Sequence, residues 1–179
     1  MAMTAQEAIA LFDASEPARV ADILGDWRGE EVPTGHPMDG LLAASFWWGK
    51  RFESPDDAHP LIHDLPLWGR QALNPALIPF HLAAQLPLRA QLGPVLMPIL
   101  APLLRTRKPK ARLRDLAFRG RVHGAMCYDA KPIHDVFVWL GPDTLLGWME
   151  ARGIERPYFF RLHREVSPRN QLRGGVGAR

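Results

Sequence analysis

Seven residues of this 179-residue chain carry side chains suited to acid–base chemistry, and they fall in two parts of the sequence. They comprise two imidazoles, three carboxylates, an amine and a phenol: His36, Asp39, Lys50, Tyr128, Asp129, His134 and Asp135. Groups of these types in one pocket can act as general acid and base on a bound substrate. One hypothesis is therefore a cofactor-free isomerase or cyclase that acts on a hydrophobic substrate. Its acid–base residues would be His36, Tyr128, Asp129 and Asp135.

The same residues have two other interpretations. Asp39 and Asp129 belong to a residue type that caps and stabilises turns, and a strand histidine such as His134 can simply hydrogen-bond to a neighbour. The other alternative is a polar clamp that orients a ligand, with His36, Lys50, Tyr128 and His134 as its members. No metal site is predicted, because the histidines and carboxylates lack a ligand spacing such as His-x-x-x-His.

The elements that position these residues begin with short helices. Apolar residues at helical spacing predict one helix over 4–12 and a second over 17–24. A first strand is expected over 27–33. The segment 40–52, which Asp39 can cap, is predicted to form a helix.

The middle of the chain is apolar but interrupted by prolines. Residues 60–73 are predicted to form two short extended pieces. The longest uncharged stretch that follows, 90–104, has 15 residues. It is too short and too kinked to span a membrane. We therefore expect two kinked amphipathic helices, over 75–86 and 90–104, that form a lid or a surface patch.

Short segments rich in β-branched or aromatic residues follow, separated by turn signals: 111–118, 121–128, 133–140, 144–149 and 157–164. This spacing is typical of an antiparallel meander that closes as a barrel. Several of these strands are apolar on both faces. Either helices cover the outside of the barrel or its interior is an apolar cavity.

The charge is small overall but concentrated in one place. The net charge is +3, and six of the ten residues from Arg105 to Arg114 are basic. Basic residues beside apolar helices suit transient contact of 90–114 with an anionic membrane surface, and a solvated linker is the alternative. Nucleic acid is not expected, because no aromatic residues interleave with these charges.

The cysteine content and the N-terminal sequence bear on location. Cys127 is the single cysteine, which excludes an internal disulfide framework and favours a reducing compartment. The first residues lack a signal-peptide pattern. We expect a cytoplasmic protein.

The run Gly25-Asp26-Trp27-Arg28-Gly29 opens the first strand. Glycines that flank an indole allow another group to approach the backbone closely. Trp27 can close one end of a barrel if its N–H finds an acceptor. An arginine stacked on the indole is a common companion, and Arg161 and Arg164 are the candidates. We assign a structural role to Gly25, Trp27, Gly29 and Arg164.

With its other motifs, the chain resembles the bacterial GXWXG family, in which that domain precedes a short C-terminal domain of unknown function. The matching motifs include Thr34-Gly35-His36-Pro37, Trp48-Gly49-Lys50-Arg51-Phe52 and Pro132-Ile133-His134-Asp135. The Gly-x-Trp opening is also similar to that of the calycins, namely the lipocalins and the intracellular fatty-acid-binding proteins. By this analogy Tyr158 and Arg161 would hold a ligand carboxylate, and they join the predicted ligand-binding set.

The resemblance implies a mainly β fold with some helix, a calycin-like antiparallel β-barrel with N-terminal helices and a helical lid inserted after the first strand. Together with the strands that are apolar on both faces, it favours binding or carriage of a fatty acid or similar lipid inside the barrel cavity. No cofactor is expected. We divide the chain into N-terminal helices (1–24), one barrel domain (25–166) and a disordered tail (167–179). The barrel domain has a GXWXG part (25–75), an apolar helical insert (75–104) and a strand meander (111–166).

Overall fold

The structure, a computed structural model, describes residues 3–79 and 89–165. Its strands are β1 (Glu16–Pro17), β2 (Gly25–Glu31), β3 (Trp47–Phe52), β4 (Ala58–Leu65), β5 (Gly69–Ala72), β6 (Ala111–Phe118), β7 (Arg121–Tyr128), β8 (Ile133–Gly141), β9 (Thr144–Ala151) and β10 (Ile154–Arg164). Its helices are α1 (Ala5–Ala14), α2 (Leu41–Ala44) and α4 (Arg89–Leu104), with the 3-10 turns η1 (Val20–Asp22) and η2 (Pro75–Leu77). The tail predicted to be disordered, 167–179, lies outside the described residues.

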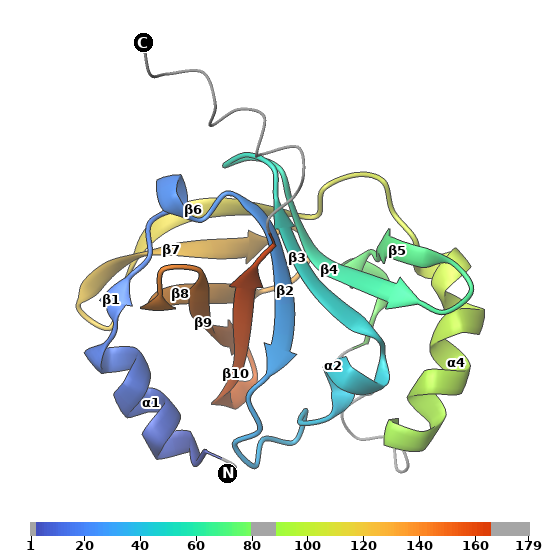
Figure 1. Ribbon diagram of the computed structural model, residues 1–179, viewed down its shortest axis with the longest axis horizontal. Helices are drawn as coiled ribbons and strands as arrows, with labels where there is room; N and C mark the ends of the chain where they lie inside the picture. Colours follow the sequence, from blue (N-terminus) through green and yellow to red (C-terminus); the bar gives the residue numbers. More distant parts are fainter. Residues whose placement is uncertain (1–2, 80–88, 166–179) are drawn as a thin grey trace.

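Eight of the strands close into an antiparallel barrel (Figure 1). The order around the barrel is β8-β7-β6-β4-β3-β2-β10-β9, and β9 pairs back to β8. The short strand β1 pairs with β8, and β5 pairs with β4. The mainly β class, the barrel and a helix inserted after the first barrel strand are therefore confirmed.

One junction of the barrel is much shorter than the others. Strand β4 pairs with β6 only at Ala58 and Ala111, whereas β6 pairs with β7 along its whole length. Beyond Ala58, the far half of β4 pairs with β5 instead, from Ile62 to Leu65. The β4–β6 seam is therefore the weakest part of the barrel wall.

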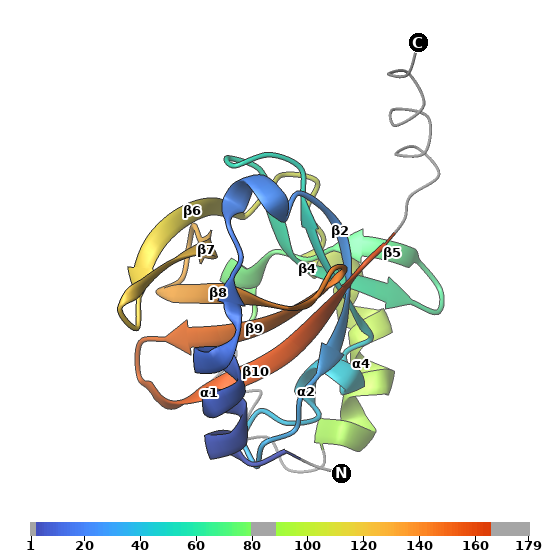
Figure 2. The same ribbon diagram turned by 60° about the vertical axis from the view of Figure 1, so that its left-hand side comes forward.

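Two apolar cores explain why several strands are apolar on both faces. The inner core fills the barrel and includes Trp27, Phe52 and Phe137. The outer core lies between the barrel and α1, where the Phe12 ring is 5.2 Å from that of Trp148. Figure 2 shows α1 in front of β9 and β10, and the chain that leaves α1 passes β8 as β1. Thr4 and Glu7 form a capping box that fixes the start of this helix.

The motif around Trp27 closes one end of the barrel. Trp27 is fully buried, and its indole N–H donates to the Ile23 carbonyl at 2.7 Å. The guanidinium of Arg164 lies 4.3 Å from the indole centroid. It also donates to the carbonyls of Leu24 at 3.0 Å and Asp22 at 2.8 Å. Arg164 therefore ties the turn before β2 to the last strand.

The predictions of secondary structure were wrong in two places. The predicted helix over 17–24 is replaced by the end of β1 and the single turn η1. The predicted helix over 40–52 stops after α2, because Phe46 has a φ of 60°, outside the right-handed helical region. Residues from Trp47 onward continue as β3 and pair with β2.

The remaining predictions can be compared element by element. The two extended pieces of 60–73 are β4 and β5, and the five predicted C-terminal strands are β6 to β10. The predicted helix over 90–104 is α4, with prolines inside it. The helix expected over 75–86 begins as the 3-10 turn η2, and its residues 80–86 lie outside the described residues. No helix in 3–79 or 89–165 is long and apolar enough to cross a membrane.

Candidate functional site

A charged cluster lies inside the barrel. Lys50 on β3 and Asp135 on β8 form an ion pair of 2.7 Å, with side chains only 3% and 1% exposed. The Lys50 ammonium also donates to the Pro60 carbonyl at 3.1 Å. The Tyr128 hydroxyl on β7 donates to Asp135 at 3.4 Å. Strand β3 and the consecutive strands β7 and β8, which are distant from it in sequence, therefore bring an amine, a carboxylate and a phenol together.

Burial governs the protonation equilibria of this cluster. It lowers the pKa of Lys50 and raises the pKa of Asp135, while the attraction between the two charges opposes both shifts. Burial and the neighbouring Asp135 also raise the pKa of Tyr128 well above its ordinary value. Such shifts are concentrated at functional sites, although structural ion pairs produce them too.

Aromatic rings surround the ammonium group. Lys50 Nζ lies 4.8 Å from the ring centroid of Phe160, 5.6 Å from that of Trp47 and 5.8 Å from that of Tyr128. Cation–π attraction to these rings offsets part of the cost of removing the charge from water. An apolar pair of similar size would fill the same space at lower desolvation cost. Stability alone therefore does not account for this ion pair.

The cluster borders a small inner cavity of about 20 Å³. Its wall includes Trp47 and Asp135, together with Met38, Leu42 and Leu61. Within the described residues, the Nε1 atom of Trp47 and the Oδ1 atom of Asp135 are buried and have no hydrogen-bond partner. One atom is a donor and the other an acceptor.

A second polar group fixes the loop that covers this cavity. The Tyr158 hydroxyl on β10 donates to Glu31 at 2.5 Å, and Glu31 accepts the backbone N–H groups of Leu42 and Ala43 at the start of α2. The His36 ring lies 5.2 Å from the Tyr158 ring. His36 Nδ1 accepts the Met38 N–H at 3.0 Å, and burial lowers the pKa of His36.

An apolar groove of about 460 Å³ adjoins the inner cavity. Apolar side chains of α2, η2 and α4 line it, and Leu42 and Leu61 line both the groove and the inner cavity. The two spaces are therefore separated by the thickness of these side chains. The polar residues of the groove are Ser45 and His63.

His63 is held as a neutral imidazole. Its Nδ1 lies 2.7 Å from the Ser45 carbonyl, an acceptor, so Nδ1 carries the hydrogen. Its Nε2 is buried without a partner among the described residues. Burial lowers the pKa of His63 to about 4.

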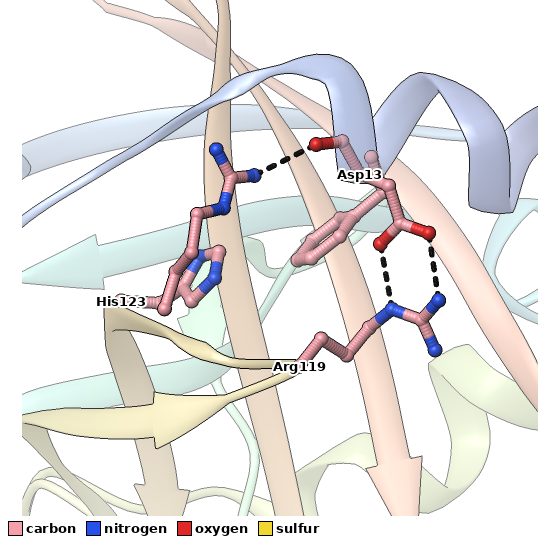
Figure 3. Close-up of a pocket in the computed structure, with 5 residues that line it drawn as sticks. Asp13, Arg119 and His123 are labelled. Carbon is pink, nitrogen blue, oxygen red and sulfur yellow. Dashed lines mark hydrogen bonds and ion pairs between the residues drawn. The ribbon is translucent and has the colours of Figure 1, made fainter.

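A third cavity, of about 420 Å³, lies between α1 and the β6–β7 hairpin (Figure 3). Arg119 binds both carboxylate oxygens of Asp13 at 2.6 Å. Arg121 donates to the carbonyls of Asp13 at 3.0 Å and Ser15 at 2.7 Å. Because these arginines already bind groups of the α1 segment, the contacts serve to attach α1 to the barrel.

The structure brings together only part of the predicted site. Lys50, Tyr128 and Asp135 meet in the inner cluster. Asp129 instead lies at the surface and pairs with Arg112 at 3.0 Å. The four residues of the acid–base hypothesis therefore do not share one pocket.

Two residues of the predicted ligand clamp also lie elsewhere. His134 is exposed, one position before the inward-facing Asp135. Arg161 lies three positions after Tyr158 on β10, so the two side chains point to opposite faces of the strand. Asp39, as its turn-stabilising interpretation required, accepts the backbone N–H groups of Thr34, Gly35 and His36.

Three site residues were not predicted: Glu31, Trp47 and His63. Glu31 lies on the same face of β2 as Trp27, four positions later, and strand alternation could have indicated this. Trp47 was assigned to a helix. The register of β3 against β4 is also irregular on both sides of Gly49, so simple alternation does not give the direction of its side chains.

Comparisons with known proteins cover most of the chain. Residues 10–64 match the family described as GXWXG protein, and residues 109–164 match a domain of unknown function, DUF4334. A solved structure described as "Crystal structure of protein from Thermomonospora curvata" is similar over 88% of this chain and 85% of that chain, with 31% identity and a TM-score of 0.65. No curated protein matches the sequence. The inner cluster joins the two matched regions, because Lys50 lies in the first and Tyr128 and Asp135 in the second.

Proposed function

This chain belongs to the family in which a GXWXG region is combined with a DUF4334 region, and from that premise we propose that it binds a hydrophobic small molecule in the groove between α2 and α4. The observation that carries the proposal is the groove itself. Its volume of about 460 Å³ and its almost wholly apolar lining are typical of small-molecule sites. The buried Lys50–Asp135 pair beside it supplies the few polar groups that orient a ligand.

The position of the groove changes the mode of binding expected from the sequence. The inner cavity of about 20 Å³ is far too small for a lipid chain, whereas the groove is already open. A chain of ten methylenes buried there gains on the order of 8 kcal/mol before ordering costs. This supports binding of roughly micromolar strength or better, with the apolar chain in the groove and its head towards the barrel.

Binding of the neutral apolar dye Nile red tests this proposal. The wild-type protein should bind the dye saturably, and known lipids should displace it. Leu96→Asp places a charge in the groove and should weaken dye binding at least tenfold, about 1.4 kcal/mol. Val95→Asp on the exposed side of the same helix is the matched control and should leave the affinity unchanged. No saturable binding by the wild-type protein, or equal loss in both variants, would contradict the proposal.

We also propose that the outer side of α4 contacts an anionic lipid surface, from which the groove exchanges its ligand. Val95 and Ile99 are spaced by four, are 62% and 66% exposed and do not line the groove, so they form a ridge on the outer side of the helix. The ridge is followed by exposed Arg105 and Arg107. Each basic residue near such a surface contributes about 1 kcal/mol. The cytoplasmic location expected from the sequence stays a prediction.

Co-sedimentation with lipid vesicles tests the membrane contact. The protein should bind vesicles that contain phosphatidylglycerol and bind pure phosphatidylcholine vesicles much more weakly. Arg107→Glu should weaken binding severalfold, while Arg152→Glu, at an exposed arginine in the turn after β9, should not. Equal binding to both vesicle types would contradict the proposal. A dimer in solution that Ile99→Asp abolishes would also contradict it, because the ridge would then be an interface between two copies of the chain.

A further inference from the structure

Trp47 and Asp135 both line the inner cavity, and each has a buried polar atom without a partner among the described residues. These two atoms define the kind of group that fits there. The carboxylate oxygen Oδ1 of Asp135 can only accept a hydrogen bond, and the indole Nε1–H of Trp47 can only donate one. A single group that serves both must therefore accept one hydrogen bond and donate another. A hydroxyl does both, whereas ether, ketone and carboxylate oxygens only accept and an ammonium only donates.

The size of the cavity agrees with a single hydroxyl. About 20 Å³ holds one group of the size of water, and a carboxylate with its three heavy atoms is larger than that. The groove reaches the cavity wall at Leu42 and Leu61, which line both spaces. A ligand whose apolar part lies in the groove can therefore reach the cavity with its terminal atom if these side chains move aside.

The charge of the cluster also excludes an acid. Lys50 and Asp135 neutralise one another at 2.7 Å, so a ligand carboxylate would add a buried negative charge without a partner. Arg161, which the analogy with fatty-acid binders had suggested as that partner, lies on the outer face of β10. The site is therefore suited to a neutral ligand.

We propose, on the premise that the groove binds an apolar molecule, that the natural ligand is an apolar alcohol. Its hydroxyl group lies in the inner cavity, accepts a hydrogen bond from Trp47 Nε1 and donates one to Asp135 Oδ1. Its hydrocarbon part passes Leu42 and Leu61 and occupies the groove. The protein thus distinguishes alcohols from the fatty acids and ethers of the same chain length.

Displacement of bound Nile red by three compounds of equal chain length tests this proposal. The compounds are 1-dodecanol, its methyl ether and dodecanoate. With the wild-type protein, dodecanol should displace the dye at a concentration about tenfold lower than either of the others, because a hydrogen bond to a charged group is gained only by the alcohol. Equal displacement by alcohol and ether would overturn the proposal and indicate a cavity that holds water alone.

Variants locate the hydroxyl. The double variant Lys50→Met and Asp135→Leu replaces the ion pair with apolar side chains, a change that proteins often tolerate. It should lose the preference for alcohol, measured relative to its own affinity for Nile red. Trp47→Phe, which removes only the indole N–H and part of the ring, should weaken dodecanol binding severalfold while dye binding persists. His63→Phe removes the unpaired acceptor of the groove and should keep the preference.

The outcomes separate this inference from the proposed function. If Nile red does not bind the wild-type protein, the groove itself is not a binding site and both proposals fail. The dye can also bind while the preference for alcohol persists in the double variant or is lost only in His63→Phe. In either case the groove binds ligands, but the assignment of the hydroxyl to the inner cavity is wrong. Circular dichroism on each variant establishes that it is folded before binding is measured.

Discussion

The glycines beside Trp27 have different physical roles. A Cβ atom at Gly29 would lie 2.2 Å from the ring of Trp47, so the indole of Trp47 packs directly on the backbone there. Gly25 has a φ of 126°, which other residues rarely adopt. The first glycine therefore allows a backbone conformation, and the second allows Trp47 to reach its place beside the inner cavity.

We predict that Gly29→Ala destabilises the protein by about 1–3 kcal/mol, because Trp47 must shift to admit the methyl group. Gly141→Ala is the matched control, since no atom lies within 4 Å of a Cβ built there, and it should change stability by less than about 0.5 kcal/mol. Urea unfolding followed by tryptophan fluorescence measures both. Equal effects of the two substitutions would show that the contact with Trp47 does not restrict position 29.

The two arginines of β10 provide a second comparison. Arg164→Ala removes the contact with Trp27 and the bonds to two carbonyls, and it should cost about 1–3 kcal/mol of unfolding free energy. Arg161 lies on the same strand without these contacts. Arg161→Ala should therefore lower the unfolding free energy by less than about 0.5 kcal/mol. Chemical unfolding of both variants in one buffer tests this. A larger effect for Arg161→Ala would contradict the role given to Arg164.

At the level of elements, the β4–β6 seam is where the barrel should open first. Strand β6 pairs with β4 at a single position, Ala111 with Ala58. Beside it, Lys110 donates its backbone N–H to Ala58, and Leu113 donates its own to Pro55 in the turn before β4. We predict that these two amide hydrogens exchange with solvent at least tenfold faster than the amides in the middle of the β6–β7 ladder, because few bonds must break to expose them. Residue-resolved hydrogen exchange by NMR measures the ratio. Uniform protection around the barrel would contradict it.

The sequence determined the C-terminal half of the fold more clearly than the N-terminal half. Strands β6 to β10 are separated by turn residues, so their number and order are readable from local patterns. In 40–52 the apolar residues fit a helix equally well, and the positive φ of Phe46 that ends α2 has no local signal. Local patterns therefore predicted the meander and failed where long-range pairing decides the structure.

The same contrast applies to the site. Strand alternation alone separates Tyr158 from Arg161, because positions three apart face opposite sides of a regular strand. The convergence of Lys50 with Tyr128 and Asp135 was suggested by residue type, but their contact depends on barrel closure and on the irregular register beside Gly49. The place of Trp47 in the cavity wall is not predictable from 40–52, because the apolar pattern there fits a helix.

At the level of the whole molecule, helices cover different sides of the barrel. Helix α1 lies on one side and α4 on another (Figure 1). The α1 side is attached by the Asp13–Arg119 pair and the outer core, whereas the α4 side has the groove and the exposed ridge. The groove in which we propose ligand binding therefore lies on the second side, and its residue Leu61 is three positions from Ala58 at the short β4–β6 seam.

The buried histidines make stability depend on pH. His63 has a pKa of about 4 when folded and 6.5 as its ordinary value, so between these values the unfolded state binds more protons. Its contribution to stability is complete above pH 6.5 and is lost as the pH falls towards 4. About 1.4 kcal/mol per pKa unit gives a loss on the order of 3 kcal/mol. Burial lowers the pKa of His36, His59 and His123 in the same direction.

Asp135 acts in the opposite direction, because burial raises its pKa and protonation then favours the folded state. The wild-type curve alone therefore does not isolate His63. We predict that His63→Gln, which cannot become charged, loses less unfolding free energy than the wild-type protein between pH 7 and pH 4.5. His134→Gln, at an exposed histidine, should follow the wild-type curve. Urea unfolding at several pH values gives the unfolding free energy of the three proteins as a function of pH. A His63→Gln curve parallel to the wild-type curve would contradict the prediction, because His63 would then bind its proton equally well in the folded and unfolded states.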